Sequence, residues 1–187
     1  MTNYLQNKQK EISYFLSMMA LLGITGVSLG AVGAQFFLQE LPCPLCLLQR
    51  AGIMAIGVGY MMCLVIGHKP RYYALSTLAG IFTMLFAMRQ VFLHITPGSG
   101  AYGDPVFGIH MYTWVVIIGA LAILGNCLVS LYLDDKYDVP AKSKLTLVGK
   151  AVVGLFVFTI ALNVLLTFME CGFTQCPDNP SDYMYIL

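Results

Sequence analysis

Five long apolar stretches decide what this chain can fold into. They run roughly over residues 14–38, 45–66, 72–93, 111–133 and 145–168 of a chain of 187 residues. Each stretch reaches or exceeds the ~20 residues that an α-helix needs to cross a bilayer. Only helices and closed barrels satisfy their backbone hydrogen bonds inside a membrane, and no stretch alternates like a barrel strand. The sequence therefore predicts an all-α integral membrane protein, built as a bundle of five transmembrane helices.

The composition agrees with a single membrane domain. Apolar residues make up 58% of the chain and charged residues only 10%, which lies outside the range of soluble domains. The segments between the apolar stretches are too short to fold by themselves. We therefore expect residues 1–187 to form one membrane domain, with residues 169–187 as a short tail.

The lysines and arginines predict the orientation of the bundle. If the amino terminus is cytoplasmic, the segments on that side carry eight of the ten basic residues and the outer loops carry none. The eight are Lys8, Lys10, Lys69, Arg71, Lys136, Lys142, Lys144 and Lys150. Arg50 and Arg89 lie inside predicted helices, near their outer ends. Because cytoplasmic loops are enriched in basic residues, we expect the amino terminus inside and the carboxyl terminus outside.

A cleaved signal peptide is the alternative for the first apolar stretch. Lysines precede this stretch, and Val32-Gly33-Ala34 would suit a signal peptidase. The stretch is longer than the apolar core of a signal peptide, however, and only five spans keep the basic loops on one side. These two observations favour a retained helix.

Four of the six cysteines fall in two pairs on the predicted outer side. Cys43 and Cys46 lie at the start of the second helix, and Cys171 and Cys176 lie just beyond the end of the fifth. A cysteine pair with two intervening residues at the start of a helix is typical of thiol redox sites, because the helix end lowers thiol pKa values. The two pairs therefore predict disulfide exchange at one face of the membrane.

The first pair has the sequence Cys43-Pro44-Leu45-Cys46. Proline suits the first turn of a helix, so we expect Cys43 at or near the N-cap and Cys46 about three residues further on. The free amides of the helix end would then stabilise a Cys46 thiolate. Arg50 follows one turn deeper, where it would act on that thiolate or donate hydrogen bonds to a bound carbonyl compound, rather than snorkel to the interface.

The second pair, Cys171 and Cys176, has four residues between its cysteines. Gly172 eases a turn there and Pro177 ends it, so a local disulfide is sterically easy. A disulfide that closes so short a loop gains little chain entropy and makes a poor structural clip, although a clip is the alternative reading. We therefore expect this pair to take part in redox chemistry.

Two segments resemble one known family. The run Cys43-Pro44-Leu45-Cys46-Leu47-Leu48-Gln49-Arg50 is similar to the signature of the bacterial disulfide bond formation protein B family, DsbB. A second stretch, from Arg89-Gln90 through His94 to Gly108-Ile109-His110-Met111-Tyr112-Thr113-Trp114, resembles a loop and helix start of the same family. The similarity extends over the first four spans.

The resemblance implies an enzyme of the bacterial inner membrane, whose helices surround a quinone site and whose active cysteines face the periplasm. Such an enzyme oxidises a periplasmic thioredoxin-fold partner, a DsbA-like dithiol oxidase, and passes two electrons to ubiquinone or menaquinone. By resemblance, Cys46 is the quinone-proximal cysteine, Cys43 is its disulfide partner, and Arg50 contacts the quinone. Arg89 and His94 are further candidates for the quinone site, with interfacial roles as their alternatives. No nucleic-acid partner is expected.

The chain departs from the best-known members of that family in one respect. Those members carry their second cysteine pair in the outer loop between the third and fourth helices, whereas residues 95–109 contain no cysteine here. We therefore predict that Cys171 and Cys176 replace the missing pair. All four outer cysteines are then catalytic candidates.

Three alternatives to this relay remain open. The outer cysteines have spacings that zinc also accepts, although an oxidising compartment argues against a tetrathiolate and we expect no metal. A vitamin K epoxide reductase-like quinone reductase is a second possibility, and a non-enzymatic adaptor with structural cysteines is the third. We expect the remaining two cysteines, Cys63 and Cys127, to be small buried apolar side chains.

Overall fold

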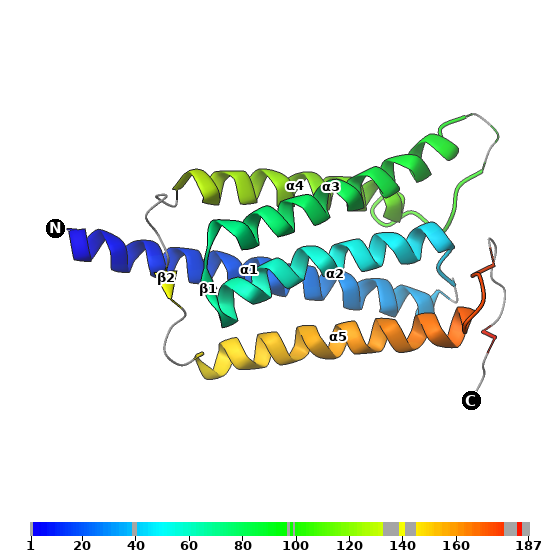
Figure 1. Cartoon of the computed structure of the whole chain (residues 1–187). Helices are drawn as coiled ribbons and strands as arrows, with labels where there is room; N and C mark the ends of the chain where they lie inside the picture. The colour runs from blue at the N-terminus through cyan, green and yellow to red at the C-terminus, as the bar shows by residue number, and fades with distance from the viewer. Residues whose placement is uncertain are drawn as a thin grey trace.

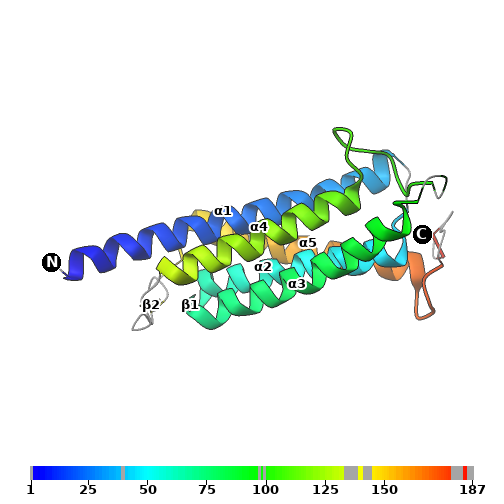
Figure 2. The ribbon, with the colours of Figure 1, turned by 90° about the horizontal axis from the view of Figure 1, so that it is seen from above.

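The computed structural model describes residues 2–38, 41–96, 98, 100–132, 139–140, 145–177 and 183–184. Its long elements are α1 (Thr2–Phe37), α2 (Pro44–Val65), α3 (Pro70–Leu93), α4 (Met111–Tyr132) and α5 (Leu147–Cys171). All five helices are long and apolar enough to cross a membrane, α1 over Glu11–Phe37. They lie side by side in one bundle (Figures 1 and 2). The predicted five-helix membrane protein is confirmed.

The bundle has two distinct ends. At one end, named the cysteine end here, α2 and α4 begin and α1, α3 and α5 finish (Figure 1). At the opposite end, the short strands β1 (Gly67–His68) and β2 (Val139–Pro140) pair antiparallel. This pairing ties the turn between α2 and α3 to the segment between α4 and α5.

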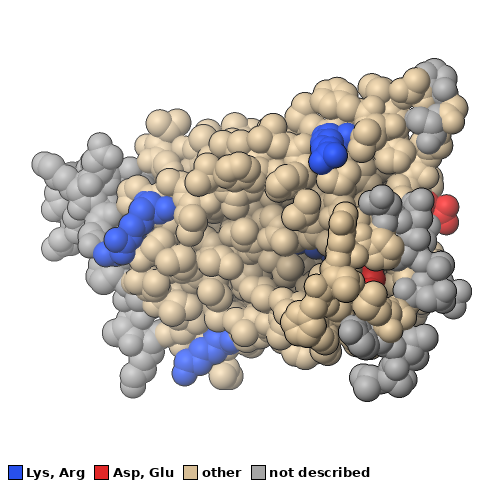
Figure 3. Space-filling model, turned by 45° about the vertical axis from the view of Figure 1, so that its right-hand side comes forward, with Lys and Arg blue, Asp and Glu red and all other residues tan. Residues whose placement is uncertain are grey.

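The flank of the bundle is apolar. Large hydrophobic side chains are exposed along all five helices, among them Phe15, Leu78, Leu124 and Phe158. In the face shown in Figure 3, Lys, Arg, Asp and Glu are sparse between the two ends of the molecule. Exposed apolar residues around an entire helix bundle are what a lipid environment favours, because lipid tails replace water as the surrounding medium.

Small residues set the close approach of α2 and α3. A Cβ atom added at Gly59 would lie 2.7 Å from the Tyr72 carbonyl oxygen and 2.7 Å from Ser76 Cβ. Without a driving force from water, membrane helices associate through such close backbone packing. Ser76 Oγ then reaches the Ile56 carbonyl oxygen at 3.0 Å. This contact joins the second half of α2 to the first part of α3, and a Cβ at Gly52 would likewise meet Thr83, so the close approach continues towards the cysteine end.

The fifth helix packs mainly on α1 and less on α2. Its N-cap is Thr146, whose hydroxyl accepts a hydrogen bond from the Gly149 amide at 3.1 Å. The same hydroxyl lies 3.0 Å from Tyr14 Oη of α1. The helix continues to Cys171, one turn beyond the predicted end, so Cys171 belongs to the helix and not to the loop beyond it.

One prediction about the isolated cysteines is wrong. Cys63 is buried within the bundle as expected, with 1% of its surface exposed, whereas Cys127 of α4 is exposed. The reason is the face of the helix on which it lies, since its neighbour Asn126 turns inward instead and is buried. An apolar sequence context cannot separate the two cases in a membrane protein, because lipid-facing residues are as apolar as the core.

Candidate functional site

Cys43 caps the first turn of α2. Its backbone is extended, Pro44 opens the helix, and Cys43 Sγ accepts a hydrogen bond from the Cys46 amide at 3.2 Å. The Cys46 amide therefore donates to Cys43 Sγ and not to Cys46 Sγ. The expectation that the helix end stabilises a Cys46 thiolate is wrong. The residue at the N-cap, not the one inside the first turn, has the geometry to accept from the free amides.

The environment of Cys43 lowers its pKa from 9.0 to about 6. The largest cause is the hydrogen bond from the Cys46 thiol, and the backbone amides of Cys46 and Leu45 and the side chain of Gln90 add to it. Burial opposes these effects, because it disfavours the charged thiolate. Cys43 is therefore the more acidic thiol of the pair and the better placed to exist as a thiolate at neutral pH.

Gln90 of α3 joins the two sulfur atoms. Its Nε2 atom lies 3.5 Å from Cys43 Sγ and 3.6 Å from Cys46 Sγ. Its Oε1 atom accepts a hydrogen bond from Gln49 Nε2 of α2 at 2.6 Å. Both glutamines are buried. Gln49 thus fixes the orientation of the Gln90 amide, so that its N–H groups face the sulfur atoms.

Arg50 is held from the side of α1. Its guanidinium donates to Gln35 Oε1 at 2.7 Å and to the Ala31 carbonyl oxygen at 2.9 Å. Gln35 donates in turn to Tyr183 Oη of the tail at 2.8 Å. Among the described residues these contacts use two of the five N–H groups of the guanidinium, and the others remain available for a ligand.

A cavity of about 120 Å³ lies beside these groups at the cysteine end. Residues from α1, α2, α3, α4 and the loop before α4 form its wall, including Cys46, Arg50, Gln90, Tyr102, Tyr112 and Trp114. Tyr102 Oη donates to the Leu41 carbonyl oxygen at 2.6 Å, which closes the loop over the chain that leads into α2. The cavity combines a thiol, hydrogen-bond donors and aromatic side chains.

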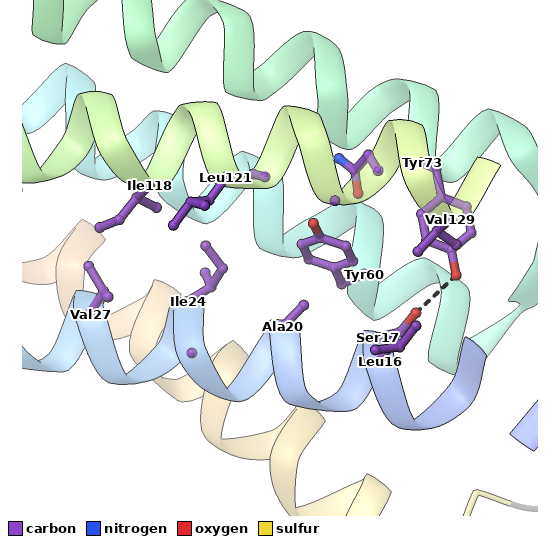
Figure 4. Close-up of a pocket in the computed structure, with 14 residues that line it drawn as sticks. Leu16, Ser17, Ala20, Ile24, Val27, Tyr60, Tyr73, Ile118, Leu121 and Val129 are labelled. Atoms are coloured by element: carbon purple, nitrogen blue, oxygen red, sulfur yellow. Dashed lines mark hydrogen bonds between the residues drawn. The ribbon is translucent and has the colours of Figure 1, made fainter. Parts of the chain in front are cut away.

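A second, larger cavity of about 430 Å³ continues from the first between α1 and α4. The two share Val27 and Ile118 in their walls, and Figure 4 shows these side chains opposite each other. The lining is mostly apolar, with Ala20, Ile24 and Leu121 among it (Figure 4). The pair of cavities therefore offers a polar end beside Cys46 and an apolar channel deeper in the bundle.

The tail cysteines lie on another side of α2. Cys171 and Cys176 form a disulfide, and Cys176 lines an open groove of about 680 Å³ between α2 and the end of α5. Pro44 and Arg50 line the same groove. The structure therefore brings the second cysteine pair to the end of the bundle that holds the first.

The structure does not bring Arg89 to the cavity. Its side chain is exposed and lines a shallow outer groove with Met88 and Phe92. Because Gln90 points inward, its neighbour on the helix must point away, so the expected quinone contact of Arg89 has no support. His94 ends α3 and stacks on Tyr112, with ring centroids 5.5 Å apart, so it lies behind the cavity wall.

Four polar side chains of the site carried no role in the sequence reasoning. Gln35, Gln49, Gln90 and Glu170 are each at least 95% buried, within helices long and apolar enough to span a membrane. Buried polar residues in such helices are rare and mark functional sites. A search for polar residues inside the apolar stretches would have found Gln35, Gln49 and Gln90, whereas Glu170 lies just beyond the stretch 145–168.

Comparisons with known proteins point to one family. A family model described as disulfide bond formation protein DsbB matches residues 13–103. A disulfide bond formation protein B of Saccharophagus degradans is 31% identical over 115 residues, which cover 56% of this chain and 68% of that protein. A Cupriavidus necator protein of the same name is 29% identical, over 79% of this chain and 91% of its own.

A shorter match is more similar in sequence. A disulfide bond formation protein B of Chromobacterium violaceum is 36% identical over 80 residues, which cover 37% of this chain and 47% of that protein. This match thus spans about half the length of the relative. No solved structure matches the chain significantly.

Proposed function

The chain belongs to the disulfide bond formation protein B family, and from that premise we propose that it reoxidises a DsbA-like thioredoxin-fold dithiol oxidase. Two electrons pass through the two cysteine pairs to a membrane quinone. The observation that carries this proposal is the contact of Gln90 with both Cys43 and Cys46, in the wall of a cavity that Arg50 also lines. An oxidoreductase of this kind supports disulfide formation in other proteins.

The residues around the first cavity fit a quinone head group. A bound ubiquinone or menaquinone would supply an acceptor for two electrons and two protons. The free N–H groups of Arg50 would hold a carbonyl oxygen, and the aromatic walls formed by Tyr112 and Trp114 would cover a flat ring. The apolar channel beyond Val27 and Ile118 would accept an isoprenoid tail. His94 stays a candidate for proton exchange behind Tyr112.

The two thiols of the first pair have different roles in this proposal. Cys46 lies in the cavity wall, whereas Cys43 is the N-cap of α2 and has the lower pKa. A thiolate is the nucleophile in disulfide exchange and also the better leaving group. We assign Cys43 to exchange with the second pair and Cys46 to exchange with the acceptor in the cavity.

The second pair is the assigned entry point for electrons. The Cys171–Cys176 disulfide lies in the last turn of α5 and the segment beyond it, where Phe173 is 92% exposed. A reduced partner would reach this disulfide at Cys176, which is half-buried, because Cys171 and Cys43 are both buried. With the basic residues on the cytoplasmic side, the cysteine end would face the periplasm of a bacterial inner membrane.

The deciding experiment is anaerobic turnover of the purified protein with a reduced thioredoxin-fold dithiol and a ubiquinone analogue. Wild type should reduce the quinone, and both Cys46→Ser and the double variant Cys171→Ser/Cys176→Ser should not. Retained activity in the double variant would make the tail disulfide a structural clip. No quinone reduction by wild type would refute the enzyme and favour an adaptor.

A further inference from the structure

Tyr183 is a tail residue whose side chain reaches back to the first helix. Its hydroxyl accepts a hydrogen bond from Gln35 Nε2 of α1 at 2.8 Å, although the two residues are 148 positions apart in the chain. Gln35 is only 3% exposed and lines the first cavity, whereas Tyr183 is half-buried. The tail beyond Cys176 therefore contacts the wall of the cavity that holds Cys46.

Gln35 uses both ends of its side-chain amide. Its Oε1 atom accepts a hydrogen bond from Arg50 at 2.7 Å, while its NH2 group donates to Tyr183. A guanidinium can only donate, so Arg50 requires the amide to present its oxygen. The NH2 group then needs an acceptor elsewhere, because a buried N–H group without one costs free energy. Among the described residues, Tyr183 Oη is that acceptor.

The orientation of the Arg50 guanidinium depends on this amide. The guanidinium has two contacts on α1, from Nη1 to Gln35 and from Nη2 to the Ala31 carbonyl oxygen. Two contacts fix a planar group, whereas a single hydrogen bond leaves it free to turn. Arg50 lines both the first cavity and the groove beside α5, but Gln35 lines the cavity and not the groove. Gln35 therefore holds the guanidinium on the cavity side of α2.

We infer that Tyr183 is a positioning residue for the first cavity, a role that rests on the proposed function. Tyr183 keeps the Gln35 amide in place, and the amide keeps the remaining N–H groups of Arg50 directed at a bound quinone carbonyl. Tyr183 does not line the cavity itself, so it acts through Gln35. The tail then has two roles, because Cys176 belongs to the disulfide that receives electrons and Tyr183 prepares the site that passes them on.

The test measures quinone binding and turnover separately. Equilibrium binding of a ubiquinone analogue to the oxidised protein gives a Kd, and anaerobic turnover with a reduced thioredoxin-fold dithiol gives kcat and the KM for quinone. Tyr183→Phe removes the acceptor and keeps the ring. It should raise both the Kd and the KM about 5-fold, the effect of losing one hydrogen bond of ordinary strength. The kcat at saturating quinone should stay as in wild type, because both cysteine pairs are intact.

A double-mutant cycle tests whether the effect passes through Gln35. Gln35→Met removes the amide and should raise the Kd and the KM at least as much as Tyr183→Phe does. In the Gln35→Met background, Tyr183→Phe should have no further effect, because residues that act as a unit are not additive. Tyr132→Phe is the matched control and should behave as wild type, since Tyr132 is an exposed tyrosine at the opposite end of the bundle.

The outcomes separate this role from the proposed function. An unchanged Kd and KM in Tyr183→Phe would overturn the positioning role and leave the proposed function intact. Additive effects of the two substitutions would overturn it as well, because the hydroxyl would then act by another route. If Gln35→Met does not fold, Tyr183→Phe decides alone: a raised KM with the kcat of wild type supports the role, and a lowered kcat with an unchanged KM overturns it. A wild-type protein that neither binds nor reduces quinone would refute the proposed function and the role that rests on it.

Discussion

The acidity of Cys43 can be tested by removing the group that contributes most to it. The pKa of Cys43 falls from 9.0 to about 6, with the hydrogen bond from the Cys46 thiol as the largest cause. A hydrogen bond to a charged group is worth about 1.5–3 kcal/mol, so its loss should raise the pKa by one to two units.

The assay follows thiolate absorbance against pH in protein whose only cysteine is Cys43: position 46 is varied, and serine replaces Cys63, Cys127, Cys171 and Cys176. Cys46→Ser keeps a hydroxyl donor and should hold the Cys43 midpoint well below the ordinary value. Cys46→Ala removes the donor but keeps the backbone amide, and its midpoint should lie at least one unit higher.

Equal midpoints in the two variants would refute the contribution of the side-chain donor. Midpoints near the ordinary thiol value in both would refute the N-cap argument as well. Because the readout is a midpoint and not a reaction rate, the burial of Cys43 does not affect the comparison.

Three further predictions test the fold and the cavity. Gly59→Ala should lower the free energy of unfolding by about 1–3 kcal/mol, because its Cβ would meet the backbone of α3. Gly125→Ala is the control and should leave the free energy of unfolding unchanged, since there is open space around Gly125. Thermal unfolding in detergent measures both variants. Burial lowers the pKa of His68 from 6.5 to about 4, so stability is full above pH 6.5 and falls by up to about 3 kcal/mol as pH drops to 4. His68→Gln should remove this pH dependence from the free energy of unfolding. If the variant lost as much stability between pH 6.5 and 4 as wild type, the prediction would be contradicted. Arg50→Lys should raise the KM for quinone about 10-fold. The planar guanidinium can donate to Gln35, to the Ala31 carbonyl and to a ligand at once, whereas a lysine ammonium cannot. An unchanged KM would exclude Arg50 from the cavity chemistry.

The spans could be predicted from the sequence because each depends on a local property. An apolar stretch such as residues 111–133 is long enough to span a bilayer whatever surrounds it, and α4 covers nearly the same residues. The first cysteine pair could be placed for a similar reason. Pro44 fixes the start of α2 by itself, and the N-cap position of Cys43 follows.

The inward and outward faces could not be predicted in the same way. Arg89 and Gln90 are neighbours in sequence and face opposite sides of α3, but lipid does not mark one face of a helix as water does. The groove that Arg50 and Cys176 both line was also hidden, because it joins positions 126 residues apart. Such pairings depend on how α5 packs, which no local pattern encodes.

The packing of the fifth helix also sets an order of events during synthesis. A chain made from its amino terminus completes α2 and α3, and the contacts between them, before α5 exists. Cys43, Cys46 and Gln90 can therefore assemble early, whereas the groove that Arg50 and Cys176 line forms only when the last helix has been inserted. A ribosome that stops before α5 would release a chain with a complete acceptor cavity and no entry point for electrons.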